Sequence, residues 1–209
     1  MIRGIFLPAL LVLVTLSTAD RPACAAAAEN DVRAFVSSMA DTAIKSLTGP
    51  DIERNVRKER FRTMIHDYFA VRSIAKWVLG RHWRRATEEQ RGEYLSLFEA
   101  MLLERYVDGF KDYTGESLDI VRAEKRAEND FIVHTLLRKP GGTQPIDVAW
   151  RVATGGRDGQ TVYKIIDIFL NGISMAQTQQ KEFNSLIHNN GNSVEALLEK
   201  MREIAKPAG

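Results

Sequence analysis

The sequence predicts an α+β fold in which helices come first, a four-stranded antiparallel sheet follows, and helices close the chain. Three observations support this order. Apolar residues recur at helical spacing before residue 113 and again after residue 174. Four segments between them are rich in β-branched and aromatic residues, and glycine-containing turns separate these segments. Helices and strands that are segregated along a chain in this way are typical of α+β domains.

The composition is that of an ordinary globular protein. Of 209 residues, 44% are hydrophobic and 27% are charged, which suits one domain. The net charge is +2 and the two signs are intermixed, so we expect no nucleic-acid partner. The tract from Arg54 to Arg62 is basic, but Glu53 and Glu59 interrupt it, and we expect it to form a solvated helix face.

The first 28 residues have the pattern of a secretory signal. Arg3 supplies a positive charge, a short apolar run from Ile5 to Leu16 follows, and small residues from Ala23 to Ala28 offer cleavage sites. The apolar run is too short to cross a bilayer, which makes an uncleaved anchor the weaker alternative. We therefore predict a signal peptide at 1–28, a single domain at 29–209 and a periplasmic location.

Cys24 is the only cysteine of the chain. It lies in a poor lipoprotein motif, because Arg21 stands where an apolar residue is expected. Cleavage after Ala25 removes this cysteine, so we expect neither a disulfide nor thiol chemistry in the mature protein.

Six helices are predicted from apolar periodicity and end signals. Asn30 or Asp31 is expected to cap the first, and Gly49-Pro50 ends it. Thr87 with Gln90 fits a capping box for the longest helix. The predicted helices cover about residues 31–47, 51–69, 71–79, 88–113, 174–189 and 193–205.

Four strands are predicted between the long helix and the closing helices. Short turns rich in Gly, Asn and Asp separate them and favour antiparallel hairpins. The predicted strands are Ser117 to Ala123, Asp130 to Lys139, Ile146 to Thr154 and Thr161 to Leu170.

The sequence lacks the motifs of several enzyme classes. It contains no phosphate-binding loop, no dinucleotide fingerprint and no paired zinc-binding motif, so we expect no cofactor and no metal. Ser174 does not lie in a nucleophile elbow. The histidines lie on four different elements and are expected to be surface or partner-bonded residues: His66, His82, His134 and His188.

Asp167 is the one candidate for catalysis, because it interrupts an apolar strand. A carboxylate there could act as a general base, as in some cone-shaped α+β isomerases. The favoured interpretation is that Asp167 points away from the core or pairs with Arg151 or Lys164 on the sheet. Without a third positioned group these residues make no active site.

Two sets of motifs resemble the MlaC family, which includes the toluene-tolerance auxiliary proteins of lipid-transporting ABC systems. The first half carries Val78–Arg84, Thr87–Gln90, Tyr94 with Phe98, and Tyr106. The second half carries Trp150-Arg151, Lys164–Ile168 and Asn171–Ser174. The order and spacing of these motifs carry the resemblance, which extends from about Asp31 to Leu198.

The C-terminal part is similar to the hopanoid-associated HpnM branch. The residues that carry this similarity are Gly172–Ala176, Thr178-Gln179, Glu182-Phe183, Ile187, Asn190-Gly191 and Val194–Leu197. Gln180 departs from the family pattern, which has an arginine at that place.

The resemblance implies a cone-shaped domain whose curved sheet and helices enclose a lipid cavity. It also implies a phospholipid or hopanoid cargo, and two partners: an inner-membrane ABC transporter complex and an outer-membrane lipoprotein or porin complex. Apolar residues of the sheet and the helices are the expected lipid-binding residues: Val78, Phe98, Met101, Leu102, Tyr106, Val133, Val148, Trp150, Ile166, Ile168, Ile173 and Met175.

Side chains alternate between the two faces of a strand, which predicts the residues that share a face on two of the strands. Ile146, Val148, Trp150 and Val152 are expected to share one face of their strand. Val162, Ile166, Ile168 and Leu170 are expected to share one face of the last strand.

Three functions remain open at this point. The favoured one is a periplasmic lipid shuttle without catalytic activity. The second is an enzyme on a similar fold that uses Asp167 or a histidine, which predicts a polar pocket. The third is an envelope adaptor, which predicts a filled core and an exposed apolar patch.

Overall fold

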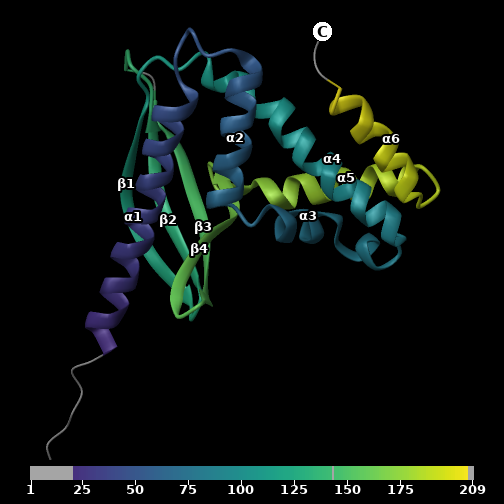
Figure 1. Cartoon of the computed structure of the whole chain (residues 1–209). Coiled ribbons are helices and arrows are strands. Elements are labelled where there is room, and N and C mark those ends of the chain that lie inside the picture. The colour runs from purple at the N-terminus through teal and green to yellow at the C-terminus, as the bar shows by residue number, and fades with distance from the viewer. Residues whose placement is uncertain (1–20, 143, 207–209) are drawn as a thin grey trace, which may run out of the picture.

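The computed structural model describes residues 21–142 and 144–206, and its helices and strands confirm the predicted α+β class (Figure 1). Most of the predicted signal peptide, residues 1–20, lies outside the described residues. The helices are α1 (Arg21–Leu47), α2 (Arg54–Tyr68), α3 (Val71–Leu79), α4 (Glu88–Tyr106), α5 (Met175–Asn189) and α6 (Val194–Ile204). Two 3₁₀ helices, η1 (Gly80–Arg84) and η2 (Val107–Phe110), follow α3 and α4.

The sheet is an antiparallel meander in the order β1-β2-β3-β4-β5. The four predicted strands are present, and a fifth, of two residues, pairs with the end of β4. Two residues are too few for an alternating pattern, so the fifth strand has no signal in the sequence. The strands are β1 (Ser117–Ala127), β2 (Asp130–Arg138), β3 (Ile146–Arg157), β4 (Gln160–Leu170) and β5 (Ile173–Ser174).

The β3–β4 hairpin is longer than predicted because its turn is shorter. Asp158 and Gly159 alone connect the strands, with φ of 52° and 78°. Positive φ at both central residues is the geometry of a two-residue hairpin turn, which glycine and aspartate tolerate. Gly155, expected in the turn, is therefore paired within β3.

The predicted starts of α4 and α6 are confirmed, whereas the predicted start of α1 and the predicted end of α4 are wrong. Thr87 caps α4 in the expected capping box with Gln90, and Ser193 caps α6. Asn30 and Asp31 do not begin the first helix, because α1 extends back to Arg21 through an alanine-rich stretch of high helix propensity. The long helix ends at Tyr106, where a 3₁₀ turn replaces its predicted last turns.

One apolar core lies between α1 and one face of the sheet. From α1 it contains Val32, Val36 and Met39, which are buried at the predicted helical spacing. The sheet contributes alternate residues of neighbouring strands: Ala123, Phe131, Val133, Val152 and Ile165. We call this set the sheet core.

A second, larger core is built by helices. Tyr94, Phe98 and Met101 of α4 lie at its centre with almost no exposed surface. Helix α6 packs along α4, α5 packs on α3, and α2 closes the group. Figure 1 shows α3 to α6 gathered to one side of the sheet, with α2 between that group and α1. We call this set the helical core.

A bulge in β4 overturns the predicted face of that strand. Arg151 of β3 lies opposite Asp167, and its neighbour Val152 already lies opposite Ile165, so Ile166 is the extra residue. Ile165 and Ile168 consequently share the face of Val152 and Trp150. The prediction that Val162 and Ile166 share the face of Ile168 is wrong, because one inserted residue shifts the alternation.

No helix in the described ranges combines the length and apolarity that a membrane span requires.

Candidate functional site

The twelve residues predicted to bind lipid divide between the two cores and the surface. Val78, Phe98 and Met101 are buried in the helical core, and Leu102 packs against it. Val133, Trp150 and Ile168 belong to the sheet core or pack against it, and Val148 is buried on the same sheet face. The others lie apart: Ile166 on the opposite face, half-buried Met175 at the start of α5, and exposed Tyr106 and Ile173. The twelve side chains therefore do not surround one void.

Helix α4 does not face the sheet, and this explains the division. Its strongest contacts are with α6, and it also contacts α2 and α3. Helix α2 lies between, since it contacts α1, α4 and β4. A cavity between the strands and the long helix, as the sequence predicted, would therefore have to form around α2.

The two cores meet at the end of α2. Tyr68 and Phe69 are half-buried and pack against both the helical core and the sheet core. Phe69 forms a bridge to Ile165 of β4, and the amide of Ala70 donates to the carbonyl of Ile165 at 3.0 Å. Tyr68 is held from the other side, where its hydroxyl lies 2.9 Å from the Thr42 hydroxyl of α1. We call this contact zone the seam.

An open pocket lies on each side of the seam. The first, of about 310 Å³, lies between α1 and α2 and includes Met64 and Asp67 in its lining. The second, of about 450 Å³, lies between the end of α2, α3 and α4. The apolar residues that line the second pocket are Phe69, Ala70, Val71, Ala75 and Leu95. The polar residues that line it are His66, Arg72, Ser73, Ser96 and Glu99.

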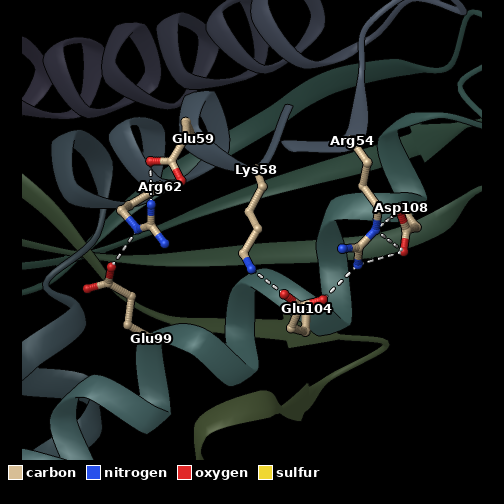
Figure 2. Close-up of polar contacts among 7 residues, drawn as sticks. All are labelled: Arg54, Lys58, Glu59, Arg62, Glu99, Glu104 and Asp108. Atoms are coloured by element: carbon tan, nitrogen blue, oxygen red, sulfur yellow. Dashed lines mark hydrogen bonds and ion pairs between the residues drawn. The ribbon is translucent and has the colours of Figure 1, made fainter. Parts of the chain in front are cut away.

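A ladder of ion pairs joins α2 to α4 (Figure 2). Figure 2 shows Arg54, Lys58 and Arg62 of α2 reaching Glu99 and Glu104 in the second half of α4 and Asp108 in η2. Arg54 donates to Glu104 at 2.7 Å and to Asp108 at 2.9 Å, and Lys58 donates to the other Glu104 oxygen. Arg62 donates to Glu99 at 3.0 Å, and His66 contacts the second Glu99 oxygen at 3.0 Å.

The ladder corrects the predicted role of the basic tract. Arg54, Lys58 and Arg62 are not a solvated face, because each is partly buried against α4. Arg57, on another face of α2, is 2% exposed and donates to the carbonyls of Leu47 and Gly49 at 2.9 Å each. The four-residue spacing of Arg54, Lys58 and Arg62 indicates one basic stripe, but its acidic partners lie 37 to 54 residues away in sequence.

The ion pairs shift the pKa values of Arg54 and Glu104. Hydrogen bonds that Arg54 donates to Asp108 and Glu104 raise the pKa of Arg54 above its ordinary value. Burial opposes ionisation of Glu104, but hydrogen bonds from Lys58 and Arg54 outweigh it, so the pKa of Glu104 lies below 4.5. Arg54 and Glu104 are therefore both charged at neutral pH.

Asp167 holds the start of α5 in place. Its Oδ1 accepts from the amides of Ile168 at 2.8 Å and Ala176 at 3.0 Å, and its Oδ2 accepts from the Ser174 hydroxyl at 2.5 Å. Ser174 in turn caps α5 by accepting from the Gln177 amide. The predicted pairing with Arg151 or Lys164 is wrong: Arg151 donates to Asp130, and Lys164 donates to the carbonyls that end α2.

The four histidines are partner-bonded or exposed, as predicted, and buried His82 accepts from the Arg81 guanidinium through its Nε2 at 3.5 Å. His66 contacts Glu99, His134 contacts Glu124, and His188 is exposed. His82 is only 1% exposed, and its Nδ1 has no hydrogen-bond partner among the described residues. Burial and the charge of Arg81 lower the pKa of His82 below 6.5.

Gln180, the departure from the family pattern, makes a structural contact. Its side-chain amide donates to the carbonyl of Trp77 at 2.7 Å, near the end of α3. The side chain therefore ties α5 to α3, where Gly80 leaves room for it.

Sequence reasoning missed Tyr68 and Phe69, although they form an apolar run with Ala70 and Val71 where two predicted helices, 51–69 and 71–79, meet. A run of this kind at a helix junction indicates a segment buried on more than one side. The pattern does not say which two cores it joins.

Comparisons with known proteins agree with the sequence and the fold. The family model described as "MlaC protein" matches residues 37–203. The intermembrane phospholipid transport system binding protein MlaC of Haemophilus influenzae is 22% identical over 165 residues, which cover 74% of this chain and 75% of that protein. A solved phospholipid-binding protein from Ralstonia solanacearum, in complex with a phospholipid, superposes with a TM-score of 0.69 at 19% identity. The superposition covers 82% of this chain and 95% of that chain, and it shows a shared fold.

Proposed function

This chain belongs to the MlaC protein family, and on that premise we propose that it is a non-catalytic carrier that binds a phospholipid or a hopanoid and moves it between the outer and inner membranes. In this proposal residues 1–28 direct export and residues 29–209 work in the periplasm. The carrier exchanges its cargo with an outer-membrane lipoprotein or porin complex and an inner-membrane ABC transporter complex. The family match and the relatives named for phospholipid binding and transport support it.

The seam between the two cores is the observation on which the proposed lipid site rests. Tyr68 and Phe69, at the end of α2, pack against both the helical core and the sheet core. Acyl chains that enter here would touch Val133, Trp150 and Ile168 on one side and α2 on the other. These three of the twelve predicted lipid-binding residues then keep their role without a preformed cavity.

The size of the cargo requires the seam to open. Exposing one methylene costs about 0.8 kcal/mol, so two acyl chains cost on the order of 20 kcal/mol in water. Pockets for drug-sized ligands already occupy about 300–1,000 Å³. The open pockets of about 310 and 450 Å³ beside the seam are too small for a two-chain lipid. The bound form therefore has α2 moved away from α4 or from α1.

The polar character of the α2–α4 interface suits this movement. Its ion pairs are contacts that water can replace when the helices separate. Phe61, Met64 and Ile65 of α2 are buried in the helical core, so the movement also exposes apolar surface. The ion pairs therefore add less to the cost of opening than these apolar residues do.

Lipid bound to the purified protein tests the carrier function. The protein is expressed, purified without detergent and extracted with organic solvent, and the extract is analysed by mass spectrometry. We expect a lipid at close to one molecule per chain, with phospholipid and hopanoid distinguished by mass. Protein that carries no lipid and takes up none from vesicles after delipidation would overturn the proposal and leave the adaptor function.

A matched pair of variants tests the position of the site. Ser96 lines the larger pocket and is exposed, so Ser96→Trp fills the pocket without disturbing a core. Ser185 is an exposed helical serine outside both pockets, and Ser185→Trp is its control. We expect Ser96→Trp to lower lipid uptake at least tenfold with an unchanged melting temperature. Equal uptake by the two variants would remove the site from this pocket.

A further inference from the structure

The outer surface of α3 and η1 concentrates positive charge. Residues 72–91 contain six Lys or Arg and two Glu, a net charge of +4, whereas the rest of the chain carries −2. Five of these basic residues are exposed, as is Trp77 between them. We call this set the basic surface: Arg72, Lys76, Trp77, Arg81, Arg84 and Arg85.

Contacts with Trp83 make the basic surface continuous from α3 to η1. The Lys76 ammonium lies 5.1 Å from the centre of the Trp83 ring, and the Arg91 guanidinium lies 5.4 Å from it. Arg91 also donates to the carbonyls of Trp83 and Arg84. Arg91, in the first turn of α4, therefore holds η1 beside α3. Arg81, Arg84 and Arg85 are consequently exposed next to Arg72 and Lys76 of α3.

The charges of the basic surface are not neutralised within the described part of the chain. None of its five basic side chains lies within 4.0 Å of a carboxylate there, unlike Arg54, Lys58 and Arg62 of the ladder. Unpaired basic side chains keep their attraction for an external anion, because no internal partner competes with it.

Trp77 adds an apolar group in the middle of this charge. It is 47% exposed, although its neighbours Val78 and Leu79 are fully buried in the helical core. An indole ring at a surface is suited to the headgroup region of a bilayer, where its apolar body and its N–H are both satisfied. Basic residues beside it add attraction to anionic lipids.

We propose that the basic surface docks the protein onto an anionic lipid bilayer, with Trp77 inserted between headgroups and the arginines of α3 and η1 against lipid phosphates. The larger pocket shares Arg72 with this surface, so docking places the mouth of the proposed lipid site at the membrane. The docking site adds to the proposed carrier function. It is measured independently of it, because vesicle binding requires no lipid in the seam.

Vesicle binding tests the proposal. The full-length mature protein is sedimented with vesicles of phosphatidylcholine alone and with vesicles that also contain phosphatidylglycerol. We expect binding to the second kind only, and weaker binding at high salt because ions screen the attraction. Binding to both kinds alike, or to neither, would overturn the proposal, and in the second case an acidic protein surface becomes the partner to test.

Charge reversal locates the surface. Arg72, Arg84 and Arg85 are exposed and make no side-chain bond within the described residues, so the triple variant R72E/R84E/R85E keeps the fold. We expect it to bind anionic vesicles about 100-fold more weakly. The matched control K111E/R126E/K139E changes the same charge at exposed positions far from α3 in sequence and is expected to bind with at most a small loss. Equal weakening of both variants would show attraction by net charge alone and would overturn the assignment.

Tryptophan fluorescence provides a second measurement. On anionic vesicles we expect a blue shift of the emission and quenching by brominated lipid chains, both absent in Trp77→Phe. Trp83 and Trp150 are half-buried and remain as internal references. A shift that survives in Trp77→Phe would place another part of the molecule in the membrane.

Discussion

Arg54 of α2 and Glu104 of α4 are joined at 2.7 Å, and the Glu104 side chain is only 6% exposed. The same carboxylate accepts from Lys58, one turn further along α2. Glu104 is therefore the central residue of the ladder, and both basic partners depend on it. The lowered pKa of Glu104 means that this contribution to stability is present above pH 4.5 and is lost as the pH falls through the folded pKa.

Glu104→Ala is expected to lower the free energy of unfolding by about 1–2 kcal/mol. The substitution leaves Lys58 partly buried without a partner and leaves Arg54 with Asp108 alone, and an unpaired buried charge costs more than the lost contact. Urea unfolding followed by circular dichroism measures the effect. Glu203→Ala, which removes an exposed carboxylate paired with Lys200 in one helix, is the control and should leave the midpoint unchanged. Equal midpoints for the two variants would contradict the role given to Glu104.

Arg57→Lys is expected to destabilise the fold by about 1–2 kcal/mol. Arg57 uses two nitrogens of its fork to bond the carbonyls of Leu47 and Gly49 after the end of α1, and lysine has no fork to span both. Thermal melting measures the loss. Arg60→Lys changes an exposed neighbour with one carbonyl contact, and its melting temperature is expected to stay at the wild-type value. An Arg57→Lys variant that melts at the wild-type temperature would show that the two hydrogen bonds make no net contribution to stability.

Asp167→Asn is expected to weaken the fold without affecting lipid content. The amide keeps an acceptor for Ile168 and Ala176 but loses the charged acceptor of the Ser174 hydroxyl, at a cost of about 1–2 kcal/mol. Chemical unfolding and mass spectrometry of bound lipid give the two results. Asp147→Asn, an exposed carboxylate of β3 without a side-chain bond among the described residues, is the control. Lost lipid in a fully folded Asp167→Asn variant would assign a direct role to this carboxylate.

His82 is expected to make stability fall in weak acid. Its folded pKa lies below 6.5, so between the two values the unfolded chain binds more protons than the folded one. The free energy of unfolding therefore decreases as the pH is lowered from 6.5 toward the folded pKa. Denaturant midpoints measured across this range should show the decrease in the wild type and in His188→Leu, an exposed control, but not in His82→Leu. An unchanged pH slope in His82→Leu would assign the decrease to other groups.

The local features of the fold were predictable because short-range rules produce them. The capping box of Thr87 and Gln90, the cap at Ser193 and the antiparallel order of four strands follow from neighbouring residues. The bulge at Ile166 was not predictable in this way. It depends on how β4 pairs with β3, and the inserted residue has the same apolar character as the residues around it.

The predicted lipid-binding residues divide between the two cores, and which of them touch a lipid stays a prediction. Val133, Trp150 and Ile168 lie in or against the sheet core. Phe98 and Met101 instead fill the helical core, because α6 covers that face of α4. Apolar periodicity identifies a buried face but does not say which element covers it.

By itself the sequence determined the fold class, the family resemblance and the spacing of basic residues along α2, because all three are patterns within short stretches of chain. Only the tertiary structure decided that Arg54, Lys58 and Arg62 face the acids of α4, and that Tyr68 and Phe69 join two separate cores. These contacts unite residues tens of positions apart. Their partners are selected by the packing of whole helices and by the burial of charge, which no local pattern contains.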